Sequence, residues 1–410
     1  MIRRSRGVLA AVALLALAGA TTVQAGPELA PPLRTQQASD VPVTVQNLRW
    51  SMLDPAVNSL MFRSMDRLFT ARAVPHAGVP WQLPRNDHAL DFSYSFGGQT
   101  HSALDGMERT YTNALLVMKD GRIVYEAYLN NSDASSRFMG WSATKSLVSI
   151  MVGTAVQQGL IRSLDDPIER YLPELADGGY RGVTVRQILQ MRSGVDYEER
   201  YDFANPGIAA MNHISALIKN ASRFVDPART IRRKAAPGTL FEYKTLDTAV
   251  LGLLLERVSG MSLSAYMSRN LWEPIGAEAD GYFIMDGAPG TGREFSGAGF
   301  NATVRDFARV GQMMLDNGRA NGRQIVPADW VALSTHPTEP VAFPALGYGM
   351  QWWTFGDGAY SAIGLQGQYI FIDPASRTVV VKTSYFPPAD ETVAEETNAF
   401  LKAAAAWQPR

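Results

Sequence analysis

The chain has 410 residues, contains no cysteine, and carries 38 basic against 39 acidic residues, for a net charge of −1. Without cysteine there is no disulfide, thiolate metal site, cysteine nucleophile or lipid-modified cysteine. The balanced charge, with no basic tract, argues against a nucleic-acid partner and favours a small-molecule or peptide-like substrate. The length predicts two domains or one large composite unit, and we expect the composite.

The first 25 residues have the pattern of a secretory signal peptide. Arginines at positions 3, 4 and 6 precede an apolar run at 7–20, and Val23-Gln24-Ala25 is a small-residue cleavage site. An apolar run of about fourteen residues is too short to span a bilayer, which takes roughly twenty. No later stretch of eighteen apolar residues follows. We expect cleavage after Ala25 and a periplasmic or secreted product with no stable membrane span.

Residues 26–102 are rich in Pro, Gln and Asn and show little sustained periodicity. We expect them to form an N-terminal extension laid over a core. Residues 103–410 then form the main domain. A hairpin begins it, because the apolar runs 114–118 and 123–128 flank the turn-forming pair Asp120-Gly121.

Helical patterns dominate from Ser142 to about residue 270. Thr184 is a candidate N-cap for a helix over 185–191, and residues 248–258 predict a strongly apolar helix. Strands return after Gly347, where 369–372 is expected to pair with 378–382, and an Ala-rich helix follows around 391–407. Strands at both ends of the domain, around a helical region, predict an α+β fold.

Ser142-Ala143-Thr144-Lys145 stands directly before the apolar run at 147–152. Residues three apart share one face of an α-helix, so the Lys145 amine can reach the Ser142 hydroxyl. In the first turn, free backbone N–H groups and the helix dipole favour negative charge that develops beside Ser142. An ordinary lysine has a pKa near 10.4, so burial or a cationic neighbour must lower the pKa of Lys145 before it can act as a base. The motif predicts a serine nucleophile paired with a lysine.

Other catalytic patterns are missing from the sequence. Position 144 is threonine, so residues 140–144 do not form the G-x-S-x-G elbow of α/β-hydrolases. The five histidines lie far apart, without metal-ligand spacing. No phosphate-binding glycine loop is present. We therefore expect no catalytic metal and no cofactor.

Two further motifs follow Ser142-x-x-Lys145 in order: Tyr243-Lys244-Thr245 and Gly364-Leu365-Gln366-Gly367-Gln368. Together they resemble the motifs of the serine β-lactamase and penicillin-binding-protein superfamily, closest to its 6-aminohexanoate-dimer hydrolase and class C-like esterase branch. Four further segments also resemble sequences of this superfamily: 163–167, 171–175, 189–195 and 299–306. The resemblance covers about residue 113 to the C-terminus. It implies a β-lactamase/transpeptidase-like fold, with an antiparallel sheet formed by the N- and C-terminal parts, helices packed on it, and an all-helical region.

The resemblance also implies roles for the second motif. Tyr243 matches the family tyrosine that hydrogen-bonds with the nucleophile and lysine and relays a proton to the leaving group. We treat Lys145 and Tyr243 as a coupled pair, either of which can accept the first proton. Thr245 stands where the family usually carries Asn or Ser, and a hydroxyl cannot copy both functions of an amide in binding substrate.

The third motif departs further from the family pattern. Alignment on Gly364 puts Ala362 and Ile363 where lactamases and transpeptidases carry the Lys and Thr that hold a substrate carboxylate. Each such charge-assisted hydrogen bond is worth on the order of 1.5–3 kcal/mol, so their loss predicts poor lactamase activity. Gly364 lets the strand approach closely, and by resemblance the N–H of Leu365 joins that of Ser142 in an oxyanion hole.

Further substrate contacts are expected from Tyr197, which resembles a substrate-contacting tyrosine of the oligomer-hydrolase branch, and from Gln366 and Gly367 beside the cleft. A core position for Tyr197 and a solvent-facing position for the glutamine remain the alternatives.

The sequence thus predicts an exported serine hydrolase that cleaves small ester or amide substrates through an acyl-enzyme on Ser142. Two other interpretations remain: a peptidoglycan-directed D-alanyl carboxypeptidase or weak β-lactamase, and a non-catalytic envelope binding protein. No motif specifies an oligomer.

Overall fold

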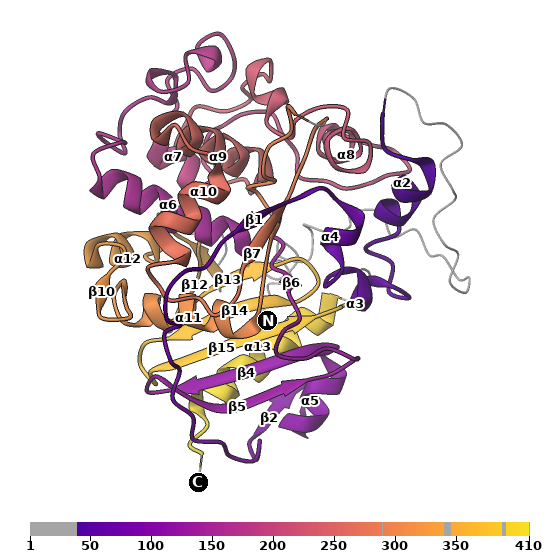
Figure 1. The fold of residues 1–410 in the computed structure, drawn as a ribbon, viewed down its shortest axis with the longest axis vertical. Coiled ribbons are helices and arrows are strands. Elements are labelled where there is room, and N and C mark those ends of the chain that lie inside the picture. Colours follow the sequence, from indigo (N-terminus) through magenta and orange to yellow (C-terminus); the bar gives the residue numbers. More distant parts are fainter. Residues whose placement is uncertain (1–38, 289, 340–345, 388–390, 410) are drawn as a thin grey trace, which may run out of the picture.

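The computed structural model describes residues 39–288, 290–339, 346–387 and 391–409, so the predicted leader lies outside the described residues. At its centre is a seven-stranded sheet in the order β11-β12-β13-β14-β15-β4-β5, with every pair antiparallel (Figure 1). Its strands are β4 Thr112–Lys119, β5 Arg122–Tyr128, β11 Leu346–Tyr348, β12 Trp353–Phe355, β13 Tyr360–Gly364, β14 Gln368–Asp373 and β15 Thr378–Ser384. Because β15 pairs with β4, the two ends of the domain form one sheet, and the expected α+β architecture is confirmed.

Both predicted hairpins of this sheet are confirmed. β4 and β5 join through Asp120 and Gly121, whose φ angles of 48° and 76° are the left-handed values that a tight hairpin turn needs. β14 and β15 pair from Tyr369↔Lys382 to Asp373↔Thr378.

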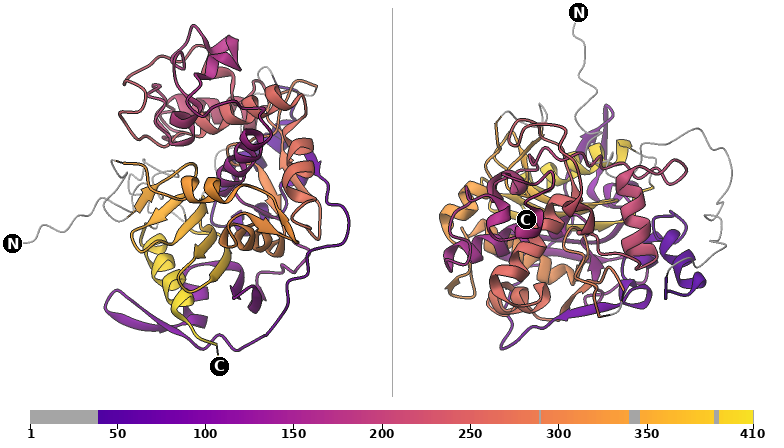
Figure 2. Two further views of the ribbon diagram at one scale, coloured as in Figure 1. Left: turned by 90° about the vertical axis from the view of Figure 1, so that its left-hand side faces the viewer. Right: turned by 90° about the horizontal axis from the view of Figure 1, so that it is seen from above.

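Helices cover both faces of the sheet (Figure 2, left). Successive strand residues point to opposite sides. Leu116 and Met118 of β4 therefore join one hydrophobic cluster, whereas Leu115 and Val117 join another. Helix α11 (Val304–Leu315) packs in the first cluster, and α13 (Glu391–Ala406) and α5 (Ala103–Arg109) pack in the second.

The helical region lies above the sheet in Figure 1. It contains most of the helices that the sequence predicts between Ser142 and about residue 270. Its helices are α6 Ala143–Gln157, α7 Val185–Leu189, α8 Ile208–His213, α9 Thr245–Ser259 and α10 Leu263–Met267; α12 Ala328–Ser334 follows later in the chain. Short 3₁₀ turns occur at Ile168–Arg170, Pro173–Leu175 and Asp226–Arg229, and π-helical turns at Ile214–Ile218 and Ser268–Trp272. Thr184 caps α7 as predicted, in a reciprocal capping box with Gln187. The helix ends before the predicted Met191, because that residue adopts a left-handed φ of 56°.

Residues 39–102 pack into the same core as the rest of the protein. Strand β1 (Ala71–Val74) forms the edge of a second antiparallel sheet, ordered β1-β7-β8-β6, with β7 Gly281–Ile284, β8 Phe300–Ala302 and β6 Phe138–Met139. Ahead of β1 lie α2 Val43–Trp50, α3 Asn58–Met61 and α4 Met65–Leu68; two small hairpins are β2 Ser93–Phe96 with β3 Gln99–Ser102, and β9 Arg319–Ala320 with β10 Arg323–Gln324. Phe62 and Met65 are almost fully buried in the main cluster.

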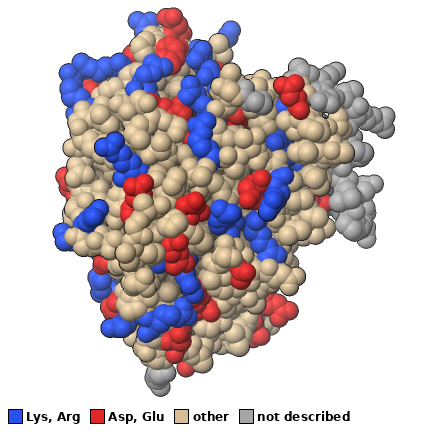
Figure 3. All heavy atoms as spheres, in the orientation of Figure 1, with Lys and Arg blue, Asp and Glu red and all other residues tan. Residues whose placement is uncertain are grey.

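The surface matches the balanced charge. On the face shown in Figure 3, basic and acidic side chains lie interspersed. Among the described helices, none has the length and apolar character that crossing a membrane requires.

Candidate active site

Ser142 lies at the N-terminus of α6, held by a short connection from the second sheet. Gly140 donates its N–H to Phe300 O (2.8 Å), which ties this connection to β8. Trp141 adopts a left-handed φ of 47°, an uncommon conformation for a bulky residue and one that is found at functional sites. Ser142 follows at once, so its hydroxyl stands where the helix dipole favours negative charge.

Lys145 is 1% exposed, and its side-chain nitrogen has three oxygen neighbours. Nζ lies 3.0 Å from Ser142 Oγ, 3.1 Å from Thr245 Oγ1 and 2.7 Å from the carbonyl oxygen of Gly297. Burial lowers the pKa of Lys145 to about 7, against an opposing effect of the Glu199 carboxylate. A large fraction of this lysine is therefore the neutral amine at neutral pH.

Tyr243 completes the group around the serine. Its hydroxyl hydrogen-bonds with Ser142, and its ring centre lies 5.0 Å from Lys145 Nζ. The ring stacks on Trp353, with centroids 5.5 Å apart, so its position is set by strand β12. Burial raises the pKa of Tyr243 well above its usual value, which keeps the phenol protonated. The structure thus brings Ser142, Lys145 and Tyr243 together from two distant motifs.

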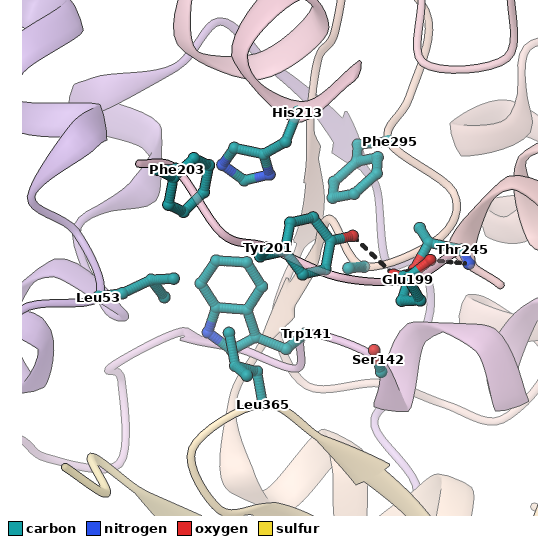
Figure 4. A pocket seen from close by; sticks show the side chains of 11 residues that line it. Leu53, Trp141, Ser142, Glu199, Tyr201, Phe203, His213, Thr245, Phe295 and Leu365 are labelled. Atoms are coloured by element: carbon teal, nitrogen blue, oxygen red, sulfur yellow. Dashed lines mark hydrogen bonds between the residues drawn. The ribbon is translucent and has the colours of Figure 1, made fainter. Parts of the chain in front are cut away.

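Glu199 was missed by sequence reasoning. It lies in the loop after α7 and accepts hydrogen bonds from the Thr245 N–H (2.8 Å), the Thr245 hydroxyl (2.5 Å) and the Tyr201 hydroxyl (2.6 Å) (Figure 4). The carboxylate caps the first turn of α9, so that helix begins at Thr245 rather than at the predicted residue 248. In sequence, Glu198 and Glu199 resemble any solvated acidic pair, and no local signal separates them.

A small pocket opens beside Ser142. Most of its lining is aromatic or aliphatic, as Figure 4 shows. The lining residues are Leu53, Trp141, Ser142, Glu199, Tyr201, Phe203, His213, Thr245, Phe295, Ala298 and Leu365. Leu53 comes from the N-terminal segment, so that segment contributes to the site. Among these described residues there is no lysine or arginine.

Gly364, the last residue of strand β13, lies beside the connection that leads from β6 to Ser142. A Cβ atom at Gly364 would lie 2.1 Å from the carbonyl oxygen of Gly140. Only glycine, which has no Cβ atom, avoids this clash. The next residue, Leu365, lines the pocket with Ser142. Ala362 and Ile363, which stand in the positions of the family's Lys and Thr, are 0% and 4% exposed.

Three residues that were expected to contact substrate are not among those that line this pocket. Tyr197 is 0% exposed, and its hydroxyl accepts a hydrogen bond from Asn212. Its ring packs in the main core, and Tyr201, four residues later, lines the pocket instead. The structure thus places Tyr197 in the core, which was the alternative to a substrate contact, because the loop directs this side chain inward.

Gln366 and Gly367 serve the turn that follows β13. Gln366 has a φ of 54°; its amide donates to Leu53 O (3.0 Å) and accepts from Asn58 Nδ2 (3.2 Å). Gly367 has a φ of 95°, and a Cβ atom there would meet the Phe386 ring at 2.5 Å. Both residues shape the backbone that carries Leu365, and neither is among the residues that line the pocket beside Ser142, so a direct contact of either with substrate stays a prediction.

Replacing Gly364 by alanine is expected to damage both fold and activity. The clash with Gly140 should lower the free energy of unfolding by about 1–3 kcal/mol. A displacement of about 1 Å near Ser142 should lower kcat/KM roughly 10²-fold. Thermal unfolding and ester hydrolysis measure the two effects. Gly356→Ala is the matched control, because its Cβ would have nothing within 4 Å; equal losses in both variants would contradict the argument.

No group of three or more His, Cys, Asp or Glu side chains that could hold a metal ion occurs in the described part of the chain. The centre has instead a hydroxyl, an amine of lowered pKa and a protonated phenol, which together suit acyl transfer.

Comparison with known proteins agrees with this arrangement. The model of the Beta-lactamase family matches residues 102–404. The 6-aminohexanoate-dimer hydrolase of Paenarthrobacter ureafaciens is 34% identical over 301 residues, which cover 69% of this chain and 75% of that protein. Esterase EstB of Burkholderia gladioli is 28% identical over 195 residues, covering 43% of this chain and 48% of the esterase.

Solved structures share the fold. One named "Putative 6-aminohexanoate-dimer hydrolase from Bacillus anthracis" has a TM-score of 0.76 at 24% identity and covers 86% of this chain and 95% of that chain. A family VIII carboxylesterase has a TM-score of 0.57 at 18% identity, covering 74% and 95%.

Proposed function

Since this chain belongs to the beta-lactamase family and is a serine hydrolase, we propose that it cleaves ester or amide bonds of small, neutral substrates through an acyl-enzyme on Ser142. The observation that carries the proposal is the 3.0 Å contact between Ser142 Oγ and the fully buried amine of Lys145. A nucleophile and a base of suitable pKa are already in contact.

The proposed reaction starts with Lys145 as the first base. The neutral amine takes the Ser142 proton as Oγ bonds to the carbonyl carbon, and the carbonyl π electrons move to oxygen. The backbone N–H groups of Ser142 and Leu365 hold that oxyanion. Tyr243, which stays protonated because its pKa is raised, passes a proton to the departing alkoxide or amine, and the Lys145 ammonium restores it. Water then attacks the acyl-serine by the same route.

The pocket supports a neutral, apolar acyl group. Among the described residues that line it there is no lysine or arginine. Burial lowers the pKa of His213 to about 4, so this histidine is uncharged at neutral pH. A substrate carboxylate therefore has no charged anchor, whereas Trp141, Phe203 and Phe295 offer apolar contact area. The names of the relatives, a 6-aminohexanoate-dimer hydrolase and an esterase, fit the same class of reaction. We expect esters to be the better substrates.

The leader pattern at 1–25 supports export, and we propose that the enzyme acts in the periplasm or is secreted.

The test is a substrate panel. The protein is incubated with p-nitrophenyl acetate, p-nitrophenyl butyrate, 6-aminohexanoate dimer and nitrocefin, and kcat/KM is compared. We expect hydrolysis of the esters, with or without the dimer, and an acyl adduct on Ser142 by mass spectrometry after rapid acid quench. Turnover of nitrocefin at rates similar to the esters would support a β-lactamase, and no turnover of any substrate would favour a binding protein.

A further inference from the structure

Glu199 reaches the catalytic lysine through one intervening hydroxyl. Its carboxylate receives the Thr245 N–H and the Thr245 hydroxyl, and Thr245 Oγ1 in turn lies 3.1 Å from Lys145 Nζ. The Tyr201 hydroxyl donates to the same carboxylate at 2.6 Å and holds it from the pocket side. Glu199 lies in none of the three sequence motifs.

The direction of each hydrogen bond follows from what each group can do. A carboxylate only accepts, so the single hydroxyl hydrogen of Thr245 points to Glu199. Thr245 Oγ1 then has only lone pairs for Lys145, which must donate to it. The carbonyl of Gly297, 2.7 Å from Nζ, also only accepts.

A neutral lysine amine has two N–H bonds and one lone pair. Thr245 and Gly297 take the two N–H bonds, so the lone pair is left for the third neighbour, Ser142 Oγ at 3.0 Å. We propose that Glu199 is a positioning residue: through the Thr245 hydroxyl it directs the N–H bonds of Lys145, so that the lone pair of the amine faces the Ser142 hydroxyl. This inference rests on the acyl-enzyme chemistry proposed above.

The arrangement also suits the state after proton transfer. The Ser142 O–H bond breaks, its proton adds to the Lys145 lone pair, and the Oγ electron pair forms the new bond to the substrate carbon. The ammonium then has three N–H bonds and three oxygen neighbours. The Glu199 charge favours this ammonium, and the neighbouring phenol of Tyr243 is uncharged.

Glu199→Gln tests the proposal because it reverses the hydrogen bonds at Oε1, which accepts from the hydroxyls of both Thr245 and Tyr201. With the amide oxygen kept on the Thr245 N–H, the two N–H bonds of the amide nitrogen donate to Thr245 Oγ1 and to the Tyr201 oxygen. The Thr245 hydrogen then turns to Lys145 and occupies the lone pair. For p-nitrophenyl butyrate we expect kcat to fall about 10²-fold with little change in KM, the lower end of the range for general-base catalysis. The acidic limb of the pH profile should move to lower pH, because the negative charge is gone.

Variants of Thr245 give an independent test. Thr245→Ser keeps the hydroxyl and should stay within a few-fold of the wild type. Thr245→Val removes it and should resemble Glu199→Gln, and the double variant should be no worse than either, because both changes break one chain of contacts. Should Glu199→Gln fail to fold by thermal unfolding, the Ser and Val pair at position 245 decides the question.

Glu198→Gln is the matched control. Glu198 is the adjacent glutamate, its side chain is 66% exposed, and its ion partner is Arg200; we expect unchanged kinetics. Wild-type kcat and pH profile in a folded Glu199→Gln protein, or equal losses in Thr245→Ser and Thr245→Val, would overturn the inference. A wild-type enzyme that neither turns over esters nor forms an adduct on Ser142 would instead refute the proposed function itself.

Discussion

Ser142→Ala is expected to abolish turnover of p-nitrophenyl butyrate, with kcat/KM falling at least about 10³-fold. Alanine cannot form the acyl-enzyme, and the remaining groups only orient and polarise a substrate, so residual rates reflect the pocket and the oxyanion site alone. The structure predicts little cost in stability, because the change removes a single hydroxyl group, whose partners include Lys145 and Tyr243. The measurements are steady-state kinetics, thermal unfolding and mass-spectrometric detection of the adduct.

Ser135→Ala is the control for this experiment. Ser135 is exposed and its hydroxyl bonds to Asp133 in a surface turn, so its loss should not change kcat/KM. Full activity in a purified Ser142→Ala protein would show that the nucleophile lies elsewhere and would refute the proposed mechanism.

Lys145→Met is the second change with a large expected effect. It removes the base but keeps a buried chain of similar length, and kcat/KM should again fall by about 10³-fold or more because Ser142 and Lys145 act as a unit. Lys402→Met, on an exposed side chain whose partner is Asp357, should be without effect. A mild loss in Lys145→Met would transfer the role of first base to Tyr243.

The pH profile of the wild type makes the same point without a mutation. Burial lowers the pKa of Lys145 to about 7, so the neutral amine predominates above that pH and the inactive ammonium below it. On the acid side, kcat/KM should therefore fall about tenfold for each pH unit below about 7 and should level off above it. A profile that stays flat down to pH 5 would contradict a lysine base with this pKa.

Features whose cause is local could be predicted from the sequence. Ser142 and Lys145 meet because residues three apart on a helix share a face. The β4–β5 hairpin depends on Asp120 and Gly121, which accept left-handed φ angles, and the start of α7 depends on the Thr184 capping box. In each case the interacting groups lie within a few residues of one another.

The position of Tyr197 could not be predicted from its sequence neighbours. Tyr197 and Tyr201 are four residues apart in an irregular loop, and no periodicity distinguishes them. The loop buries the first against Asn212 and leaves the second at the pocket, where it donates to Glu199. Which tyrosine lines the pocket depends on how the loop packs against α8 and α9, and no short-range pattern in the sequence encodes that packing.

The spacing of Ser142 and Lys145 by itself put the two residues on one helix face, and the ordered motifs, through the family resemblance, pointed to Tyr243 and to the β-lactamase-like α+β fold. Only the tertiary structure decided the surroundings of the lysine that suit it to the proposed role of a base. Its pKa depends on burial by segments far apart in the chain, and the direction of its N–H bonds depends on Gly297, Thr245 and Glu199. Leu53 likewise enters the pocket from the N-terminal segment. Desolvation and hydrogen-bond direction arise only when distant residues are packed together, and no local pattern encodes them.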